Sequence, residues 1–188
     1  MNDRVRAWSR RDFFDPAPVL IALRLVEIEL AQSDTPDLVR RLRANRLKTD
    51  REGRDALLFA HGMSVAAGAT VFVSPGESED CDFITRFNVD DTAHFSCVQL
   101  KELVPEDRNP TQTFEGLIAQ LQGLPPSDAV LAIRLNRRQQ IPLAELAAAR
   151  VPFAELWYFW ASSADSSSWS LYGDVLTSPQ LHSFEYPR

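Results

Sequence analysis

The chain has 188 residues and a formal net charge of −6, with 45% hydrophobic and 24% charged residues. This composition is that of an ordinary globular protein, and it excludes a disordered, collagen-like or disulfide-stapled chain. The longest apolar stretch, residues 16–30, is interrupted by Arg24, Glu27 and Glu29, so we expect no membrane span. The N-terminal residues lack the apolar core of a secretory signal. With only two cysteines, a cytoplasmic protein is expected.

Positive charge is concentrated in one segment of this acidic chain. Residues 40–54 contain seven Lys and Arg residues against Asp50 and Glu52. Such a patch can face the phosphates of a nucleic acid, and we expect DNA rather than RNA as the partner. The alternative is a solvated helix face, which is how most charge runs behave. The candidate nucleic-acid-binding residues are Arg40, Arg41, Arg43, Arg46 and Lys48.

The first third of the chain is predicted to be helical. Residues 16–31 fit either a helix or a strand, whereas Thr-Pro-Asp at 35–37 predicts a helix over 35–47. A further helix is predicted over 49–68, because Thr49 and Glu52 have the spacing of a capping box and Gly68 can end it. The residues expected to face inward are Ala56, Leu57, Phe59, Ala60 and Met63.

The remaining residues alternate between strand and helix patterns. Strands are predicted over 69–73, 80–89, 94–103, 129–135 and 156–161, with helices starting near 109–111 and over 143–150. Residues 74–76 are predicted as a turn and 162–170 as a loop. The order predicts an α/β fold with a mixed sheet and helices on both faces. Residues 1–48 are expected to form a helical and basic extension packed on the core, and residues 49–188 a single domain.

The second and third strands form a predicted hairpin that carries the most informative polar residues. A two-residue turn at 90–91 places Asp82 opposite Gln99. Because opposite residues point to the same side and neighbours alternate, one face of the sheet should gather four polar side chains. These are Asp80, Asp82, Gln99 and Lys101.

Carboxylates, an amide carbonyl and a lysine on one face suit metal-assisted hydrolysis of phosphodiester bonds. Mg²⁺ prefers oxygen ligands, and a lysine can hold the attacking water and offset charge on the phosphate oxygens. The alternative is an exposed sheet face with a cross-strand ion pair between Asp80 and Lys101.

The segments E-D-C-D-F-I at 79–84 and V-Q-L-K-E-L at 98–103, with the order of elements around them, resemble the PD-(D/E)XK nuclease superfamily. The resemblance implies a restriction-endonuclease-like core and Mg²⁺ or Mn²⁺ as the cofactor. It implies that Asp82 binds the metal, that Gln99 contributes its carbonyl and that Lys101 orients the water. Glutamine replaces the usual acid at position 99, so further negative charge should come from Asp80 or from a helix acid.

Many members of this superfamily carry an acid on the first core helix. Glu52 and Asp55 are the candidates here, since they lie one helical turn apart on one face. Asp55 is ranked slightly higher, because the capping box already accounts for Glu52, and the alternative for Asp55 is a plain surface acid.

Three functions remain open at this point. The first is a metal-dependent nuclease, and the second is a catalytically inactive nuclease-fold protein that acts as a binding or interaction module. The third is an interaction domain unrelated to nucleases. A homodimer is expected in the first case, because nucleases of this type often dimerise to cut two strands.

The hairpin also makes a prediction about the two cysteines. With the turn at 90–91, Cys97 shares the face of Gln99 and Lys101, whereas Cys81 points to the other side of the sheet. The Cβ atoms of a disulfide lie within about 4.5 Å of each other. We therefore expect no disulfide between Cys81 and Cys97.

Overall fold

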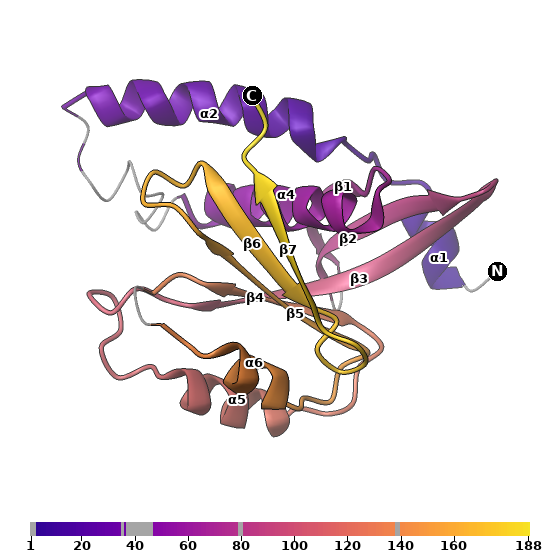
Figure 1. The fold of residues 1–188 in the computed structure, drawn as a ribbon. Helices are drawn as coiled ribbons and strands as arrows, with labels where there is room; N and C mark the ends of the chain where they lie inside the picture. Colours follow the sequence, from indigo (N-terminus) through magenta and orange to yellow (C-terminus); the bar gives the residue numbers. More distant parts are fainter. Residues whose placement is uncertain (1–2, 35, 37–46, 79–80, 138–139) are drawn as a thin grey trace.

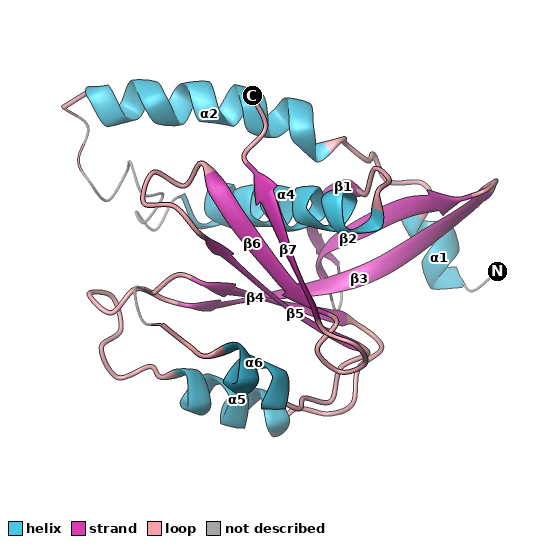
Figure 2. Ribbon diagram, viewed as in Figure 1, coloured by secondary structure: helices cyan, strands magenta, loops and turns pink. Residues whose placement is uncertain are grey.

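The computed structural model describes residues 3–34, 36, 47–78, 81–137 and 140–188. Helices cover both faces of one mixed sheet (Figures 1 and 2). The helices are α1 (Asp3–Trp8), α2 (Pro16–Gln32), α4 (Lys48–Ala67), α5 (Phe114–Gln122) and α6 (Leu143–Ala148). The strands are β1 (Phe72–Ser78), β2 (Cys81–Val89), β3 (Thr92–Leu103), β4 (Val130–Leu135), β5 (Glu155–Ala161), β6 (Ser168–Gly173) and β7 (Gln180–Glu185).

The seven strands lie in the sheet in the order in which they occur in the chain. β1, β2 and β3 form an antiparallel meander, β3, β4 and β5 are parallel, and β6 and β7 return antiparallel. The parallel strands need crossover connections, which α5 and α6 provide. The predicted α/β class, with a mixed sheet and helices on both faces, is confirmed.

Alternating side chains of the strands build two cores. On one face the sheet packs against α4, with α2 lying outside α4 (Figure 1). On the other face it packs against α5, α6 and Trp8 of α1. β5 contributes to both cores, Trp157 and Phe159 to the first and Leu156 and Tyr158 to the second. The prediction that both faces of this strand are covered is therefore confirmed.

The two long helices differ in how they begin. Asp15 caps α2 by accepting a hydrogen bond from the backbone N–H of Ala17, and Pro16 stands at the first position, so the ambiguous segment is a helix. α4 begins one residue before Thr49 without a side-chain cap, so the predicted capping box is wrong. α4 ends as predicted at Gly68, which has φ of 64°. Four predicted inward residues, Ala56, Leu57, Phe59 and Ala60, are buried, and Met63 packs against the same core.

Other segments differ from the sequence prediction. The predicted turn at 74–76 is an irregular part of β1, where Gly76 has φ of 107°. The helix expected from 109–111 begins at Phe114, capped by Thr113. The serine-rich segment is not all loop, because β6 starts at Ser168, and β7 was not predicted. The helix predicted over 35–47 falls almost entirely outside the described residues.

No helix in the described ranges combines the length and apolar character needed to cross a membrane.

Candidate metal and nucleic-acid site

The β2–β3 hairpin has the predicted register over most of its length. Its turn lies at residues 90–91, and the antiparallel ladder runs from Val89 opposite Thr92 to Phe83 opposite Val98. Phe83 and Val98 both pack in the core under α4, as opposite residues should. The next residue along each strand is Asp82 on β2 and Gln99 on β3.

At this point the alternation of β2 breaks, and the prediction about the cysteines is wrong. Cys81 and Cys97 form a disulfide with their Cα atoms 5.3 Å apart. Both are buried in the core that α5 and α6 cover. The β1–β2 pairing is irregular at the same place, because β1 has one more residue than β2 between the pairs Pro75–Phe83 and Ser78–Cys81, as in a β-bulge.

Asp82 consequently faces α4. It lines a cleft of about 320 Å³ with Glu52 and Gly53 of α4 and Leu100 of β3. Oδ2 of Asp82 accepts a hydrogen bond from the backbone N–H of Leu100 at 2.6 Å. Glu52 lies 3.5 Å from Lys48 in an exposed ion pair. We call this hollow the α4 cleft. It brings together two of the acids that the sequence predicts as metal ligands.

Gln99 and Lys101 lie on the opposite face of the sheet. They alternate along β3 with Val98 and Leu100, which pack under α4. Gln99 lines a separate cavity of about 510 Å³ with Arg4 and residues 124–128. The structure therefore does not bring Gln99 and Lys101 together with Asp82, because the break at Cys81 reverses the side that Asp82 takes.

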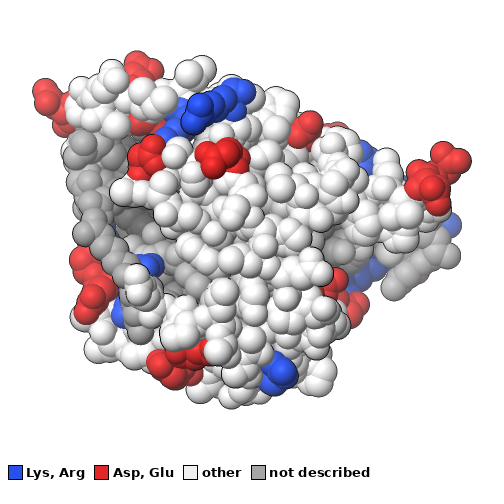
Figure 3. Space-filling view, viewed as in Figure 1, with Lys and Arg blue, Asp and Glu red and all other residues white. Residues whose placement is uncertain are grey.

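Asp80 and its expected ion pair with Lys101 lie outside the described residues. So do Arg40, Arg41, Arg43 and Arg46 of the basic segment. In the described part of that segment, Lys48 pairs with Glu52, and Arg51 lies 3.8 Å from Glu102 of β3. On the face drawn in Figure 3, basic and acidic side chains of described residues are interspersed.

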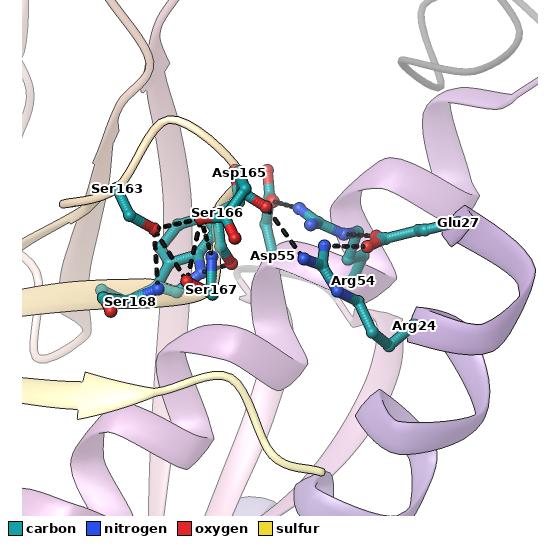
Figure 4. A network of polar contacts seen from close by, with 10 residues as sticks. Arg24, Glu27, Arg54, Asp55, Ser163, Asp165, Ser166, Ser167 and Ser168 are labelled. Carbon is teal, nitrogen blue, oxygen red and sulfur yellow. Dashed lines mark hydrogen bonds and ion pairs between the residues drawn. The ribbon is translucent and has the colours of Figure 1, made fainter. Parts of the chain in front are cut away.

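Asp55 is engaged in a different way from Glu52. It is only 2% exposed and forms a close ion pair with Arg134 of β4. The preceding Arg54 pairs closely with Glu27 of α2 and lies 4.0 Å from Asp55. Figure 4 shows Glu27 of α2 and Arg54 of α4 pointing toward each other, with Asp55 beside Arg54. Asp55 is therefore already neutralised by an arginine, which leaves Glu52 as the helix acid in the cleft.

The buried charge cluster, as we call this group, joins α2, α4 and β4. Its members are Arg24, Glu27, Arg54, Asp55 and Arg134. Burial disfavours the charge on Arg54, but the carboxylates of Glu27 and Asp55 more than offset this and raise its pKa. Both Arg54 and Arg134 lie over the ring of Trp169, at 5.8 and 5.7 Å from its centroid.

A serine-rich turn borders the cluster (Figure 4). The backbone carbonyl of Asp165 accepts a hydrogen bond from Arg24 at 2.9 Å. Hydrogen bonds from the hydroxyl of Ser163 and from the backbone and hydroxyl of Ser167 lower the pKa of Asp165 to about 2. No local pattern in the sequence indicates this cluster, since Asp55 and Arg134 lie 79 residues apart.

The α4 cleft has the donor chemistry that Mg²⁺ requires. In the residues that the structure describes, no group of three or more His, Cys, Asp and Glu side chains is arranged to hold a metal ion. Mg²⁺ does not need such a cage, because it is commonly held by one or two carboxylates together with waters and substrate phosphates. Asp82 and Glu52 supply two hard carboxylates in one hollow.

Comparisons with protein-family models, curated proteins and solved structures find no match to this chain. Function must therefore be inferred from the fold, the α4 cleft and the placement of Gln99 and Lys101.

Proposed function

We propose that the protein is a Mg²⁺-dependent nuclease of the PD-(D/E)XK type that acts on DNA rather than RNA. The observation that carries the proposal is the α4 cleft, where Asp82 and Glu52 lie together. The order of elements supports it: α4, the β1–β3 meander, α5, and then β4 parallel to β3. That order is the one the resemblance implies for a restriction-endonuclease-like core, which is part of this proposal.

The chemistry assigns a separate task to each side chain. In the α4 cleft Asp82 would hold Mg²⁺ together with Glu52, whereas on the other face of the sheet Gln99 would take that place. The metal when bound would polarise the phosphate. Lys101 would hold the attacking water and offset the charge that develops on the phosphate oxygens. This task requires Lys101 on the same face as Asp82.

A second function is favoured by one specific observation. Lys101 and Asp82 lie on opposite faces of the sheet, as the disulfide and the two cores require. A protein held in this arrangement would bind metal and nucleic acid in the cleft without cleaving. The second candidate is therefore a nuclease-fold protein that acts as a binding module.

A cleavage assay separates the two functions. Supercoiled plasmid is incubated with the protein in reducing buffer, with and without Mg²⁺. A nuclease nicks the plasmid only with Mg²⁺, and Asp82→Asn and Lys101→Ala each lose at least about a hundredfold in rate while folding normally. Asp50→Asn is the control. It removes an exposed acid of α4, and this variant should cleave like wild type. Retarded but intact plasmid would support the binding module instead.

Nucleic-acid binding has its own test, which includes residues outside the described part of the chain. If Arg40, Arg41, Arg43 and Arg46 contact phosphates, affinity falls as salt increases, and their replacement by Gln flattens that dependence. If neither salt nor these substitutions change the affinity for nucleic acid, the basic segment is not a binding surface.

A homodimer is also part of the proposal, and α2 supplies a surface for it. The charged side chains of Arg24 and Glu27 on α2 are used in the buried charge cluster. The outer side of α2 carries three apolar residues, Leu25, Val26 and Ile28, which are 66%, 51% and 46% exposed to solvent. Sedimentation of wild type and Leu25→Glu tests this: a dimer that Leu25→Glu dissociates supports it, and a wild-type monomer contradicts it.

A further inference from the structure

The regular β2–β3 ladder ends next to Asp82, so a single irregular residue decides on which face of the sheet Asp82 lies. Phe83 opposite Val98 is the last regular pair, and both side chains lie under α4. If the same register continued, Asp82 would lie opposite Gln99 on the face of Lys101, and Cys81 would lie under α4. In the structure both residues lie on the faces opposite to these: Asp82 is in the α4 cleft, and Cys81 is in the core under α5 and α6.

The disulfide is incompatible with the regular register. Cys97 points toward α5 and α6, so a bond to Cys81 requires that Cys81 points there too. Asp82 is the next residue and turns to the α4 cleft, where the backbone N–H of Leu100 donates to its carboxylate. The disulfide and the grouping of Asp82 with Gln99 and Lys101 therefore exclude each other.

We propose that the Cys81–Cys97 disulfide is a redox switch that determines on which face of the sheet Asp82 lies. In the oxidised chain Asp82 stays in the α4 cleft beside Glu52. In the reduced chain the ladder continues regularly, and Asp82 joins Gln99 and Lys101. The consequence for cleavage rests on the proposed nuclease function, whereas the movement of Asp82 does not.

The chemical step is the reduction of one disulfide by a dithiol. The dithiol gives two electrons and two protons: the Sγ–Sγ bond breaks, each cysteine sulfur becomes a thiol, and the reductant closes to its own disulfide. Cys97 also lines a cavity of about 240 Å³ beside Val5 and Trp8 of α1. A small reductant would approach the bond from this cavity.

A cross-linking experiment tests the movement without using activity. In the background of Cys81→Ser and Cys97→Ser, the variants Asp82→Cys and Gln99→Cys are combined and exposed to a mild oxidant. The regular register puts these two side chains directly opposite each other, so a disulfide between positions 82 and 99 forms, as peptide mapping detects. Asp82→Cys with Leu100→Cys is the matched control, which the same register places on opposite faces. Cross-linking only in the control overturns the switch, and so does cross-linking in neither, provided that circular dichroism shows folded protein.

Cleavage then tests the consequence. Plasmid nicking with Mg²⁺ by the wild type is at least about tenfold faster with dithiothreitol than after oxidation, whereas Cys81→Ser and Cys97→Ser cleave equally in both. Equal cleavage by oxidised and reduced wild type would overturn the redox switch but would still support the nuclease function. Formation of the 82–99 cross-link without cleavage in either state overturns the nuclease function and leaves the movement of Asp82 standing.

Discussion

The acidic residues Glu52 and Asp55 lie one helical turn apart on α4, and they differ in burial and in the partners of their carboxylates. Asp55 belongs to the buried charge cluster, where arginines of α4 and β4 surround it. Glu52 lies at the rim of the α4 cleft, and its side chain is 37% exposed. A carboxylate that already has buried cationic partners serves the fold, whereas a solvated carboxylate in a hollow can exchange its partner for a metal ion. The comparison therefore selects Glu52 as the helix acid for a metal site in the α4 cleft.

The largest effect is expected from removing an acid of the buried charge cluster. Asp55→Ala leaves the Arg134 guanidinium buried without its partner, and we expect a loss of about 3–5 kcal/mol in the free energy of unfolding. Urea denaturation followed by tryptophan fluorescence measures it. Asp50→Ala, which removes an exposed acid of the same helix, is the control and should change stability by less than about 0.5 kcal/mol. An equal effect of the two substitutions would contradict the structural role of Asp55.

A paired replacement sharpens this result. Asp55→Leu combined with Arg134→Met removes both charges, and we expect it to recover most of the stability that Asp55→Ala loses, to within about 1–2 kcal/mol of wild type. The same denaturation experiment checks it. A double variant as unstable as Asp55→Ala would mean that the ion pair is not the main contribution of these residues.

Removing the acids of the α4 cleft should affect Mg²⁺ binding rather than stability. Glu52→Gln and Asp82→Asn are expected to change the stability of the metal-free protein by about 1 kcal/mol or less, because Glu52 is solvated and the amide oxygen introduced by Asp82→Asn can still accept from the backbone of Leu100. In wild type, millimolar Mg²⁺ should raise the melting temperature through binding to the folded state. Both variants should lose this rise. A Mg²⁺-dependent shift that persists in both would place the metal elsewhere.

The smallest effect concerns His61, farther along the same helix. Burial lowers its pKa despite its contact with the carbonyl of Glu185 at 3.2 Å. Because the folded state disfavours the protonated ring, stability should fall as pH drops through about 6.5, the pKa of the unfolded state. The ring is half-buried, so the change should be below about 1 kcal/mol. His61→Gln should remove this component from melting curves recorded across that range, and an unchanged pH dependence would contradict it.

The fold class and most elements could be predicted because they depend on local patterns. Phe114, Leu117 and Leu121 have helical spacing, and the turn at 90–91 sets the register of the hairpin. The sequence of β6 does contain a strand pattern, because Ser168 and Ser170 alternate with Trp169 and Leu171. Its high serine content nevertheless favoured the prediction of a loop. β7 is more exposed, so its pattern was weaker.

The site was harder to predict because a single break in alternation decides it. The arithmetic that correctly pairs Phe83 with Val98 fails one residue later, where β1 also changes register. Nothing in a period-two pattern shows where such an irregularity falls. The role of Asp55 was hidden for another reason: its partner Arg134 comes from a distant strand, and only the folded chain brings them together.

The order of the strands has a consequence for how the chain folds. Each strand pairs with the one before it, so closing each loop costs little entropy and the sheet can grow by adding one strand at a time. α4 departs from this order, because it precedes β1 yet also packs against β6 and β7. A Cβ atom at Gly62 would lie 2.8 Å from the Phe184 ring, so this contact needs a close approach of helix and strand. The core beneath α4 cannot be complete until β6 and β7 are in place, so we expect docking of this helix, rather than strand pairing, to be the late step of folding.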